Sequence, residues 1–369
     1  MTATFPLLNL SSAVSEHVLQ FMKFPDLFDL SQCSKRTFNL VKDTFKNTPS
    51  DLSIGIDTSP CVSIATRDET LFGEAAWNFY DARNPLRIDL EDPSTYNVDG
   101  LLVKFCRIDV GVQGYPEFEC ASDHSIRDFM KFCEHLIDLF NATIHELHFD
   151  CRMTKYLKQL QSEETFRTSR YVSFNNIGIV THDGLRQILK GFDTKHLSLS
   201  CHTKPNFILD EMTTVEKIDA YSSSLINSRV LRNLDFTQGI FRDVALTNDV
   251  LHSVVKHWME GSNTRLEFLC VSVLLPEFDN REPRPQQPRW DIAKILEGIE
   301  TLPGAAKIPD VARYFSRFED VPYANGFDLK RESDGMLATV VLFTDAINHE
   351  TFLFEVWQVP DPNVVVVVD

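Results

Sequence analysis

Three short amphipathic segments follow one another in the first 46 residues, and they constrain the fold of this 369-residue chain more than any other feature. Ser11 or Ser12 can cap a first helix by accepting a hydrogen bond from a free N–H. Pro25 suits the first turn of a second helix, and Ser34 can cap a third. A unit of about forty residues rarely folds without a metal, a disulfide or another chain, and no Cys–His cluster offers a metal site, so the sequence predicts a partner. The apolar positions at helical spacing are Val14, Val18, Phe21 and Met22, then Leu27, Phe28 and Leu30, then Phe38, Val41 and Phe45.

Three runs in this stretch carry a family resemblance: Phe5-Pro6-Leu7-Leu8, Asp26-Leu27-Phe28-Asp29-Leu30-Ser31, and Cys33-Ser34-Lys35-Arg36 leading to Leu40-Val41. They resemble an F-box in the form found in a large nematode family. The opening Leu-Pro of other F-boxes is Phe-Pro here, and their third-helix Trp is absent, as is usual in the nematode form. The alternative from the residues alone is a helical cap on the next domain.

The resemblance implies that the segment docks on the Skp-type adaptor of a cullin–RING (SCF) ubiquitin ligase. The contacts would be apolar residues of the N-terminal arm and the helices. Periodicity does not decide which of them face the partner and which face the small internal core. The expected adaptor contacts are Phe5, Pro6, Leu7, Leu10, Val18, Leu27 and Leu30.

Composition fits an ordinary globular protein with two or three core-forming units at about 150 residues each. The net charge of −17 is uneven, because residues 1–46 carry +1 and the remainder carries −18. An acidic body repels phosphate backbones and anionic lipid headgroups, so we expect neither nucleic acid nor a membrane as a partner. The acidic charge either attracts a basic substrate region or serves solubility.

Cysteine usage and the N-terminus indicate the compartment. The eight cysteines form no Cys-x-x-Cys pair and mostly stand among apolar neighbours, which is typical of a reduced intracellular protein. The N-terminus lacks the basic region and continuous apolar stretch of a signal peptide, and no run approaches 18 apolar residues. We therefore expect a cytoplasmic or nuclear protein without a signal peptide.

Residues 51–112 alternate between apolar and polar positions in a way that predicts a small β-rich layer. Leu52, Ile54 and Ile56 form one apolar series, and Val62 and Ile64 form the next after a turn. Further strands are predicted at Leu86–Leu90 and from Leu101 to Val112.

A weak internal repeat follows this layer. Five four-residue segments share the order apolar, any, apolar, small polar, and their starts are 25, 25, 37 and 35 residues apart. Helix-like segments at Phe129–Phe140, Leu185–Leu189 and Val250–Trp258 lie between some of them. The spacing favours a leucine-rich-repeat-like α/β body with parallel strands, and the alternative is an ordinary α/β domain whose short strands look alike by chance. The segments are Leu147–Asp150, Val172–Asn175, Leu197–Ser200, Leu234–Thr237 and Leu269–Ser272.

A second resemblance lies in the run from Trp258 to Leu269. It looks like the signature of the type 2 F-box-associated domain, which follows the F-box in that nematode family and is inferred to bind substrates. Gly261 is expected to end the preceding helix as a left-handed cap. The matching residues are Trp258, Gly261, Asn263, Arg265, Leu266 and Leu269.

The C-terminal third begins with a loop and ends with strands. Residues 276–290 contain four prolines and predict an exposed loop, in which Trp290 is a candidate substrate anchor. Phe327–Arg331, Met336–Phe343 and Thr351–Val359 predict an antiparallel sheet, with Asp334-Gly335 in a tight turn. The Val364–Val368 tail is β-prone and predicts either a docked strand or an exposed aggregation risk.

No motif for catalysis stands out. His145, His148 and Cys151 are the best metal candidate, but on a strand His148 points away from the other two. The sequence holds no Gly-x-Ser-x-Gly, phosphate-loop or His-Glu-x-x-His pattern. We therefore expect no catalytic, cofactor or metal site, and we expect an adaptor rather than an enzyme.

The predicted fold is α+β: an F-box (1–46), a β-rich layer and repeat-like F-box-associated body (47–275), a proline-rich loop (276–290), and a C-terminal helix with antiparallel strands packed on the body (291–369). The function expected from the resemblance is substrate recognition in an SCF-type ligase. Its partners would be a Skp-type adaptor, through it a cullin, and an unknown protein substrate. The alternatives are an interaction scaffold without a ligase role and an unrecognised hydrolase.

Overall fold

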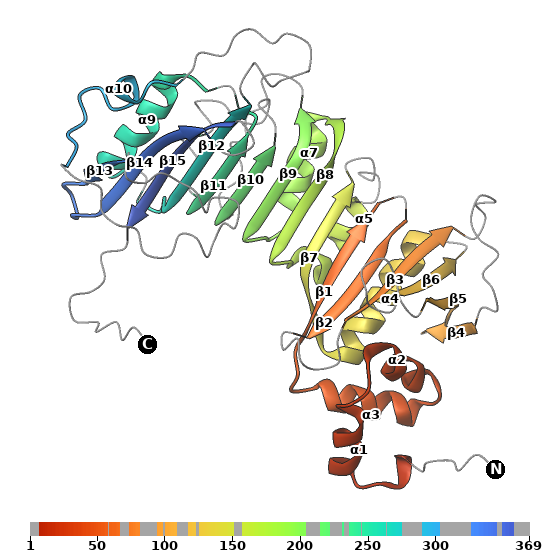
Figure 1. Cartoon of the computed structure of the whole chain (residues 1–369). Coiled ribbons are helices and arrows are strands. Elements are labelled where there is room, and N and C mark those ends of the chain that lie inside the picture. The colour runs from red at the N-terminus through yellow and green to blue at the C-terminus, as the bar shows by residue number, and fades with distance from the viewer. Residues whose placement is uncertain are drawn as a thin grey trace. The chain divides into compact units, whose positions relative to one another are not determined.

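A computed structural model describes residues 7–57, 59–66, 74–81, 94–98, 100–108, 117–122, 125–150, 157–203, 215–221, 231, 236–244, 246–262, 264–274, 290–302, 326–344 and 349–357. The chain divides into two compact units. The first contains Met1–Asn175 and Phe192–Thr194, and the second contains Asn176–Gly191 and Lys195–Asp369. Each unit has its own helices and strands (Figure 1).

Three α-helices open the first unit, as the sequence predicted, and a 3-10 turn that was not predicted precedes them. Ser34 caps the third helix in a capping box, because its Oγ accepts from the Thr37 N–H while Thr37 Oγ1 accepts from the Ser34 N–H. Pro25 lies in the first turn of the second helix, where its missing N–H costs no helical hydrogen bond. Ser11 occupies the N-cap of the first helix without a side-chain capping bond. The elements are η1 (Leu7–Asn9), α1 (Ser12–Leu19), α2 (Phe24–Gln32) and α3 (Lys35–Phe45).

The sheet of the first unit has the order β8-β7-β1-β2-β3-β6-β5-β4, with residues 171–175 of β8 in this unit. β1 pairs antiparallel with β2 and parallel with β7, and β7 pairs parallel with β8. The predicted β-rich layer is therefore continuous with the strands that follow it. The strands are β1 (Ser50–Ile56), β2 (Cys61–Thr66), β3 (Glu74–Asp81), β4 (Ser94–Val98), β5 (Leu101–Ile108), β6 (Glu117–Ser122), β7 (Ala142–Asp150) and β8 (Tyr171–Val180).

The core of the first unit lies between this sheet and α4 (Ser125–Phe140), the helix predicted at Phe129–Phe140. The rings of Phe79 and Phe129 are 5.3 Å apart, and those of Trp77 and Phe132 are 5.7 Å apart. β1 alternates buried and half-buried residues along its whole length, so one face of the sheet meets α4 and the other does not. Two short helices, α5 (Leu157–Ser162) and α6 (Glu164–Arg167), follow β7.

The sheet of the second unit has the order β13-β14-β15-β12-β11-β10-β9. β9 to β12 pair in parallel, while β12–β15, β15–β14 and β14–β13 are antiparallel, which confirms the predicted C-terminal antiparallel strands. The helices α7 (His182–Gly191) and α9 (Asn248–Met259) were also predicted, and α10 (Ile292–Ile295) is one turn long. The strands are β9 (His196–Thr203), β10 (Lys217–Tyr221), β11 (Gln238–Arg242), β12 (Phe268–Leu274), β13 (Phe327–Lys330), β14 (Leu337–Thr344) and β15 (His349–Trp357).

Four of the five repeat-like segments lie in strands, namely β7, β8, β9 and β12. Residues 147–150 of β7 pair one to one with residues 172–175 of β8 in parallel register. In the fifth segment, residues 234–235 lie outside the described residues, and the described strand begins at Gln238. β10, which the sequence did not predict, lies with β11 between β9 and β12.

The C-terminal end of α9 is built as predicted. Gly261 has a φ of 76°, in the left-handed region that favours glycine. Trp258 is fully buried, with its ring 5.2 Å from that of Phe354 and the Arg331 guanidinium 4.6 Å from its centroid. Trp258 thus anchors α9 against the C-terminal strands.

Trp290 corrects a prediction, because it is only 6% exposed. Its Nε1 donates to the Leu246 carbonyl at 2.8 Å, so its ring stabilises the second unit and is not displayed as a substrate anchor. The predicted strand Leu86–Leu90, residues 276–289 of the proline-rich loop and the Val364–Val368 tail lie outside the described residues.

Candidate docking site

The N-terminal helices place aromatic side chains in the core of the first unit. Phe24, Leu27 and Phe28 on α2 have no exposed surface. The Phe28 ring lies 5.6 Å from that of Phe132 on α4 and 5.7 Å from that of Trp77 on β3. The small core expected for three short helices is therefore completed by the body, which supplies apolar surface that the helices alone could not bury.

Polar contacts join the same helices to the body. Tyr96 on β4 donates its hydroxyl to Asp29 Oδ1 at 2.8 Å. Gln32 Nε2 lies within hydrogen-bonding distance, 3.2 Å, of Nε2 of the buried His135 on α4. These directional bonds fix the orientation of α2 on the sheet and α4, because hydrogen bonds weaken steeply when they are misaligned.

A different part of the N-terminal helical module, which consists of η1, α1, α2 and α3, displays apolar side chains to solvent. Phe21, just after α1, is 79% exposed, and Val14 on α1 is 48% exposed. Exposed apolar residues that gather on one small module are typical of a protein-binding surface. Their half-buried apolar neighbours in the module are Leu7, Leu8, Leu10, Val18, Met22 and Leu30.

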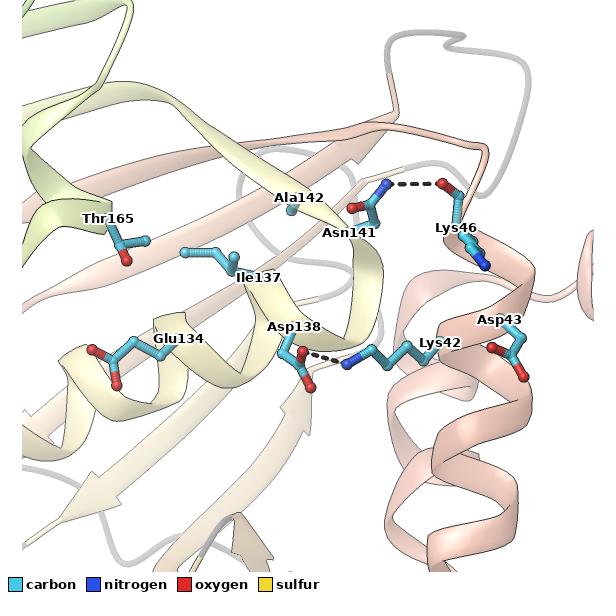
Figure 2. A pocket seen from close by; sticks show the side chains of 9 residues that line it. All are labelled: Lys42, Asp43, Lys46, Glu134, Ile137, Asp138, Asn141, Ala142 and Thr165. Atoms are coloured by element: carbon cyan, nitrogen blue, oxygen red, sulfur yellow. Dashed lines mark hydrogen bonds and ion pairs between the residues drawn. The ribbon is translucent and has the colours of Figure 1, made fainter.

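A cavity of about 520 Å³ lies beside α3, against the C-terminal half of α4. Figure 2 shows Lys42 of α3 reaching Asp138 of α4, with which it forms an ion pair, and Asn141 donating to the Lys46 carbonyl at 3.1 Å. Burial, and then the charge of Glu163, raise the pKa of Glu134 in its wall. The lining residues are Lys42, Asp43, Lys46, Glu134, Ile137, Asp138, Asn141, Ala142 and Thr165.

Comparison with known protein families identifies the helical module. Residues 7–47, which span η1, α1, α2 and α3, match the family model of the F-box domain. These helices are an F-box domain. The F-box expected from the sequence is thereby confirmed, and F-box domains generally act as adaptors that bind Skp-type proteins.

The whole chain has a distant relative. It is similar to an uncharacterized protein of the nematode Caenorhabditis elegans, with 21% identity in an alignment that covers 97% of this chain and 78% of that protein. No solved structure matches the chain. Within the part of the chain that the structure describes, no helix is long and apolar enough to cross a membrane.

The structure places the expected adaptor contacts of the F-box at different depths. Leu7, Leu10, Val18 and Leu30 are half-buried and keep some surface for a partner, whereas Leu27 is fully buried. Phe5 and Pro6 lie outside the described residues. Val14 and Phe21 are the most exposed large apolar side chains among the described F-box residues, and they were not among those contacts. The signal for them was the number of apolar residues in α1 and the turn after it, which exceeds what a small core can bury.

The histidines considered as metal ligands are engaged with carboxylates. His148 Nε2 lies 3.1 Å from Glu146 Oε2, and this hydrogen bond is the main cause that lowers the pKa of Glu146. His145 Nδ1 lies 3.9 Å from Asp51 Oδ2. Cys151 lies outside the described residues, and no group of three or more potential metal ligands occurs within them.

Proposed function

We propose that this chain is the substrate-recognition subunit of an SCF-type ubiquitin ligase. Its F-box would bind a Skp-type adaptor and, through it, a cullin, while the rest of the chain binds a protein target for ubiquitination. The F-box match at residues 7–47 carries this proposal. The chain would not be an enzyme, because ubiquitin transfer chemistry lies on the other subunits, and it would act in the cytoplasm or the nucleus.

The exposed apolar surface of the F-box supports adaptor binding. Phe21 and Val14 would lie at the centre of the contact, because they bury the most apolar area on docking. Leu7, Leu10, Val18 and Leu30 would surround them, together with the arm residues Phe5 and Pro6. Leu27 would support this surface from beneath, since its side chain is fully buried.

Co-purification of the full chain with a Skp-type adaptor tests the proposal. Wild type should capture the adaptor, and a Val14→Asp, Phe21→Asp double variant should not, because acidic side chains would replace the exposed apolar contacts. Leu102→Asp is the matched control, since Leu102 on β5 is 68% exposed and lies outside the F-box. If wild type itself fails to bind a purified adaptor, the ligase role is lost, and the chain is better explained as a non-catalytic interaction scaffold.

Substitution of Leu30 adds a second arm to this test. Leu30 is half-buried, so Leu30→Asp changes the adaptor surface, whereas Leu27→Asp would also place a charge in the core. A melting temperature measured for each variant separates loss of docking from loss of folding. Loss of adaptor binding in Leu30→Asp without loss of stability would support the proposed contact.

The body, on the same proposal, is a type 2 F-box-associated domain with leucine-rich-repeat-like strands. The anchoring of Trp258 by Phe354 and the left-handed Gly261 support the first part, since both belong to the signature run. The parallel pairing of β7 with β8, and of β9 through β12, supports the second part. A crystal structure of a relative with a confirmed domain of this type would test it through the position of the matching Trp.

A further inference from the structure

One face of the second unit's sheet is free of α9. Trp258 places α9 on the face that carries Phe354, and Phe354 pairs across the sheet with Leu269. Leu269 pairs in turn with Gly239, and side chains alternate between faces along a strand. Arg242, three residues beyond Gly239, therefore lies on the face opposite α9.

Tyr221 and Arg242 form a stacked pair on that opposite face. They are direct partners in the parallel pairing of β10 with β11, and the Arg242 guanidinium carbon lies 4.7 Å from the centroid of the Tyr221 ring. Tyr221 is 38% exposed and Arg242 is half-buried. In the part of the chain that the structure describes, Arg242 forms no ion pair. Its planar guanidinium is held against the Tyr221 ring, and its N–H groups bind no carboxylate there.

The stacked pair borders a buried apolar cluster on the same face. Ile240, two residues before Arg242, belongs to this cluster and is 9% exposed. Because the side chains of this cluster are buried, the exposed ring of Tyr221 is the apolar surface that a segment reaching Arg242 would cover. Stacked Tyr and Arg residues at such a border are the residue types that most often anchor protein interfaces. The other members of the cluster are Phe268, Cys270, Val341 and Leu353.

We propose that the Tyr221–Arg242 pair is the anchor of a docking surface for a partner-protein segment in which a carboxylate side chain stands beside an apolar residue. The carboxylate would accept two parallel hydrogen bonds from the guanidinium, and the apolar residue would cover the Tyr221 ring. The inference deepens the proposed function, on which it rests, because it gives the chemistry of the target that the body binds.

The surrounding charges favour a carboxylate over a phosphate group. Asp219 lies on the same strand as Tyr221, two residues away and on the same face of the sheet, where its carboxylate repels a dianion more strongly than a monoanion. Phosphate recognition generally uses a cluster of arginines, whereas a monoanionic carboxylate matches one guanidinium. The body is also acidic overall, which opposes a dianion more than a monoanion.

Selection of short random peptides displayed on phage against the full chain tests this surface. Wild type should enrich peptides with Asp or Glu beside an apolar residue. A synthetic peptide from that selection should bind Arg242→Gln and Tyr221→Ala at least about tenfold more weakly than wild type. Lys256→Gln is the charge-matched control, because Lys256 is exposed on α9 and should leave binding unchanged.

Changes in the peptide and in the arginine sharpen the test. Replacement of the acidic residue by Gln should weaken binding about as much as Arg242→Gln does, and Arg242→Lys should also lose affinity because an ammonium neither stacks as a plane nor binds in a bidentate manner. Equal binding of the Gln peptide, tighter binding of a phosphoserine peptide, unchanged binding by Arg242→Gln, or failure to select any peptide would each overturn the proposal. Melting temperatures confirm that the variants fold.

Adaptor capture measured on the same proteins separates the two proposals. Arg242→Gln should still co-purify with a Skp-type adaptor, since Arg242 lies outside the F-box. Loss of peptide binding with adaptor capture intact is the expected result. Failure of wild type to capture the adaptor would count against the ligase role. The peptide result would then still test the docking surface, independently of that role.

Discussion

The ring of Phe28 on α2 lies 5.7 Å from the ring of Trp77 on β3, so a helix of the F-box and a strand of the sheet share one aromatic core. Both side chains are fully buried. The F-box is therefore held by side-chain packing against the first unit, and substitutions in α2 act on both parts of that unit.

Phe28→Ala should lower the free energy of unfolding by about 3–5 kcal/mol, because it removes a fully buried ring and leaves a cavity between Trp77 and Phe132. Urea denaturation followed by tryptophan fluorescence measures this change. Phe21→Ala is the control, since Phe21 is 79% exposed and its truncation should change stability by no more than about 0.5 kcal/mol. Equal effects of the two variants would contradict the shared core.

Glu355 on β15 should make the second unit less stable as pH rises. Burial raises the pKa of Glu355 from 4.5 to about 7. Below pH 4.5 the carboxyl is protonated in both states and the native state keeps its full stability, whereas above that pH the unfolded state releases the proton first. The loss is complete once pH passes through about 7. It should amount to the order of 1–2 kcal/mol after allowance for partial exposure.

Glu355→Gln isolates this effect, because the amide does not titrate. Thermal melts of wild type and variant across the same pH range should diverge, with the variant the more stable of the two at alkaline pH. The same decline of stability with pH in both proteins would contradict the role given to Glu355.

Asp334→Asn should destabilise the β13–β14 turn more than Arg331→Met does. Arg331 is 2% exposed, stacks on Trp258, and donates to both Asp334 oxygens at 2.7–3.1 Å. Loss of the carboxylate leaves a buried guanidinium without its counter-charge, whereas Met replaces it with an apolar chain of similar length. Melting temperatures of the two variants give the order, and the reverse order would contradict this account.

Gly239→Ala should destabilise the second unit by about 1–3 kcal/mol through overpacking. A Cβ at this position would come within 2.5 Å of Phe236 Cε2 and 2.9 Å of Phe241 Cε2. Gly298→Ala is the comparison, because its Cβ would meet nothing within 4 Å and only its positive φ would cost energy. In a double-mutant cycle, Gly239→Ala should destabilise the Phe236→Ala variant less than it destabilises wild type. Simple additivity of the two stability changes would count against the clash.

Local sequence patterns predicted the helices, strands and turns that are specified by residues close together in the chain. α3 has a capping serine at Ser34 and apolar residues at helical spacing, and β1 alternates Leu52, Ile54 and Ile56 with polar or small residues. The predicted turn before β14 contains Gly335, whose φ is 79°. In each case the information lies within a few neighbouring residues, so no knowledge of the rest of the fold was needed.

Elements that depend on distant partners were missed. β10 has Ile218 and the small Ala220 as its buried side chains, which gives a weak apolar alternation, and its strand geometry comes from pairing with β9 and β11. The insertion of β1 between β2 and β7 is likewise a long-range pairing that periodicity does not contain.

The burial of individual F-box side chains could not be predicted for the same reason. Leu27 and Phe21 both fall on predicted apolar faces, yet Leu27 has no exposed surface and Phe21 is 79% exposed. The difference arises because α2 packs against α4 and the sheet, whereas Phe21 follows the end of α1 and meets no such surface.

If the chain has the proposed ligase role, the aromatic core shared by α2, α4 and β3 has a consequence for how a target is presented. An F-box on a flexible tether would let every lysine of a bound target reach the ubiquitin-loaded enzyme in turn. Here, a swing of the F-box would expose Phe24 and Phe28 to water. A target held by the first unit would therefore face the ligase at one angle, and the choice of modified lysine would be set by geometry as well as by affinity.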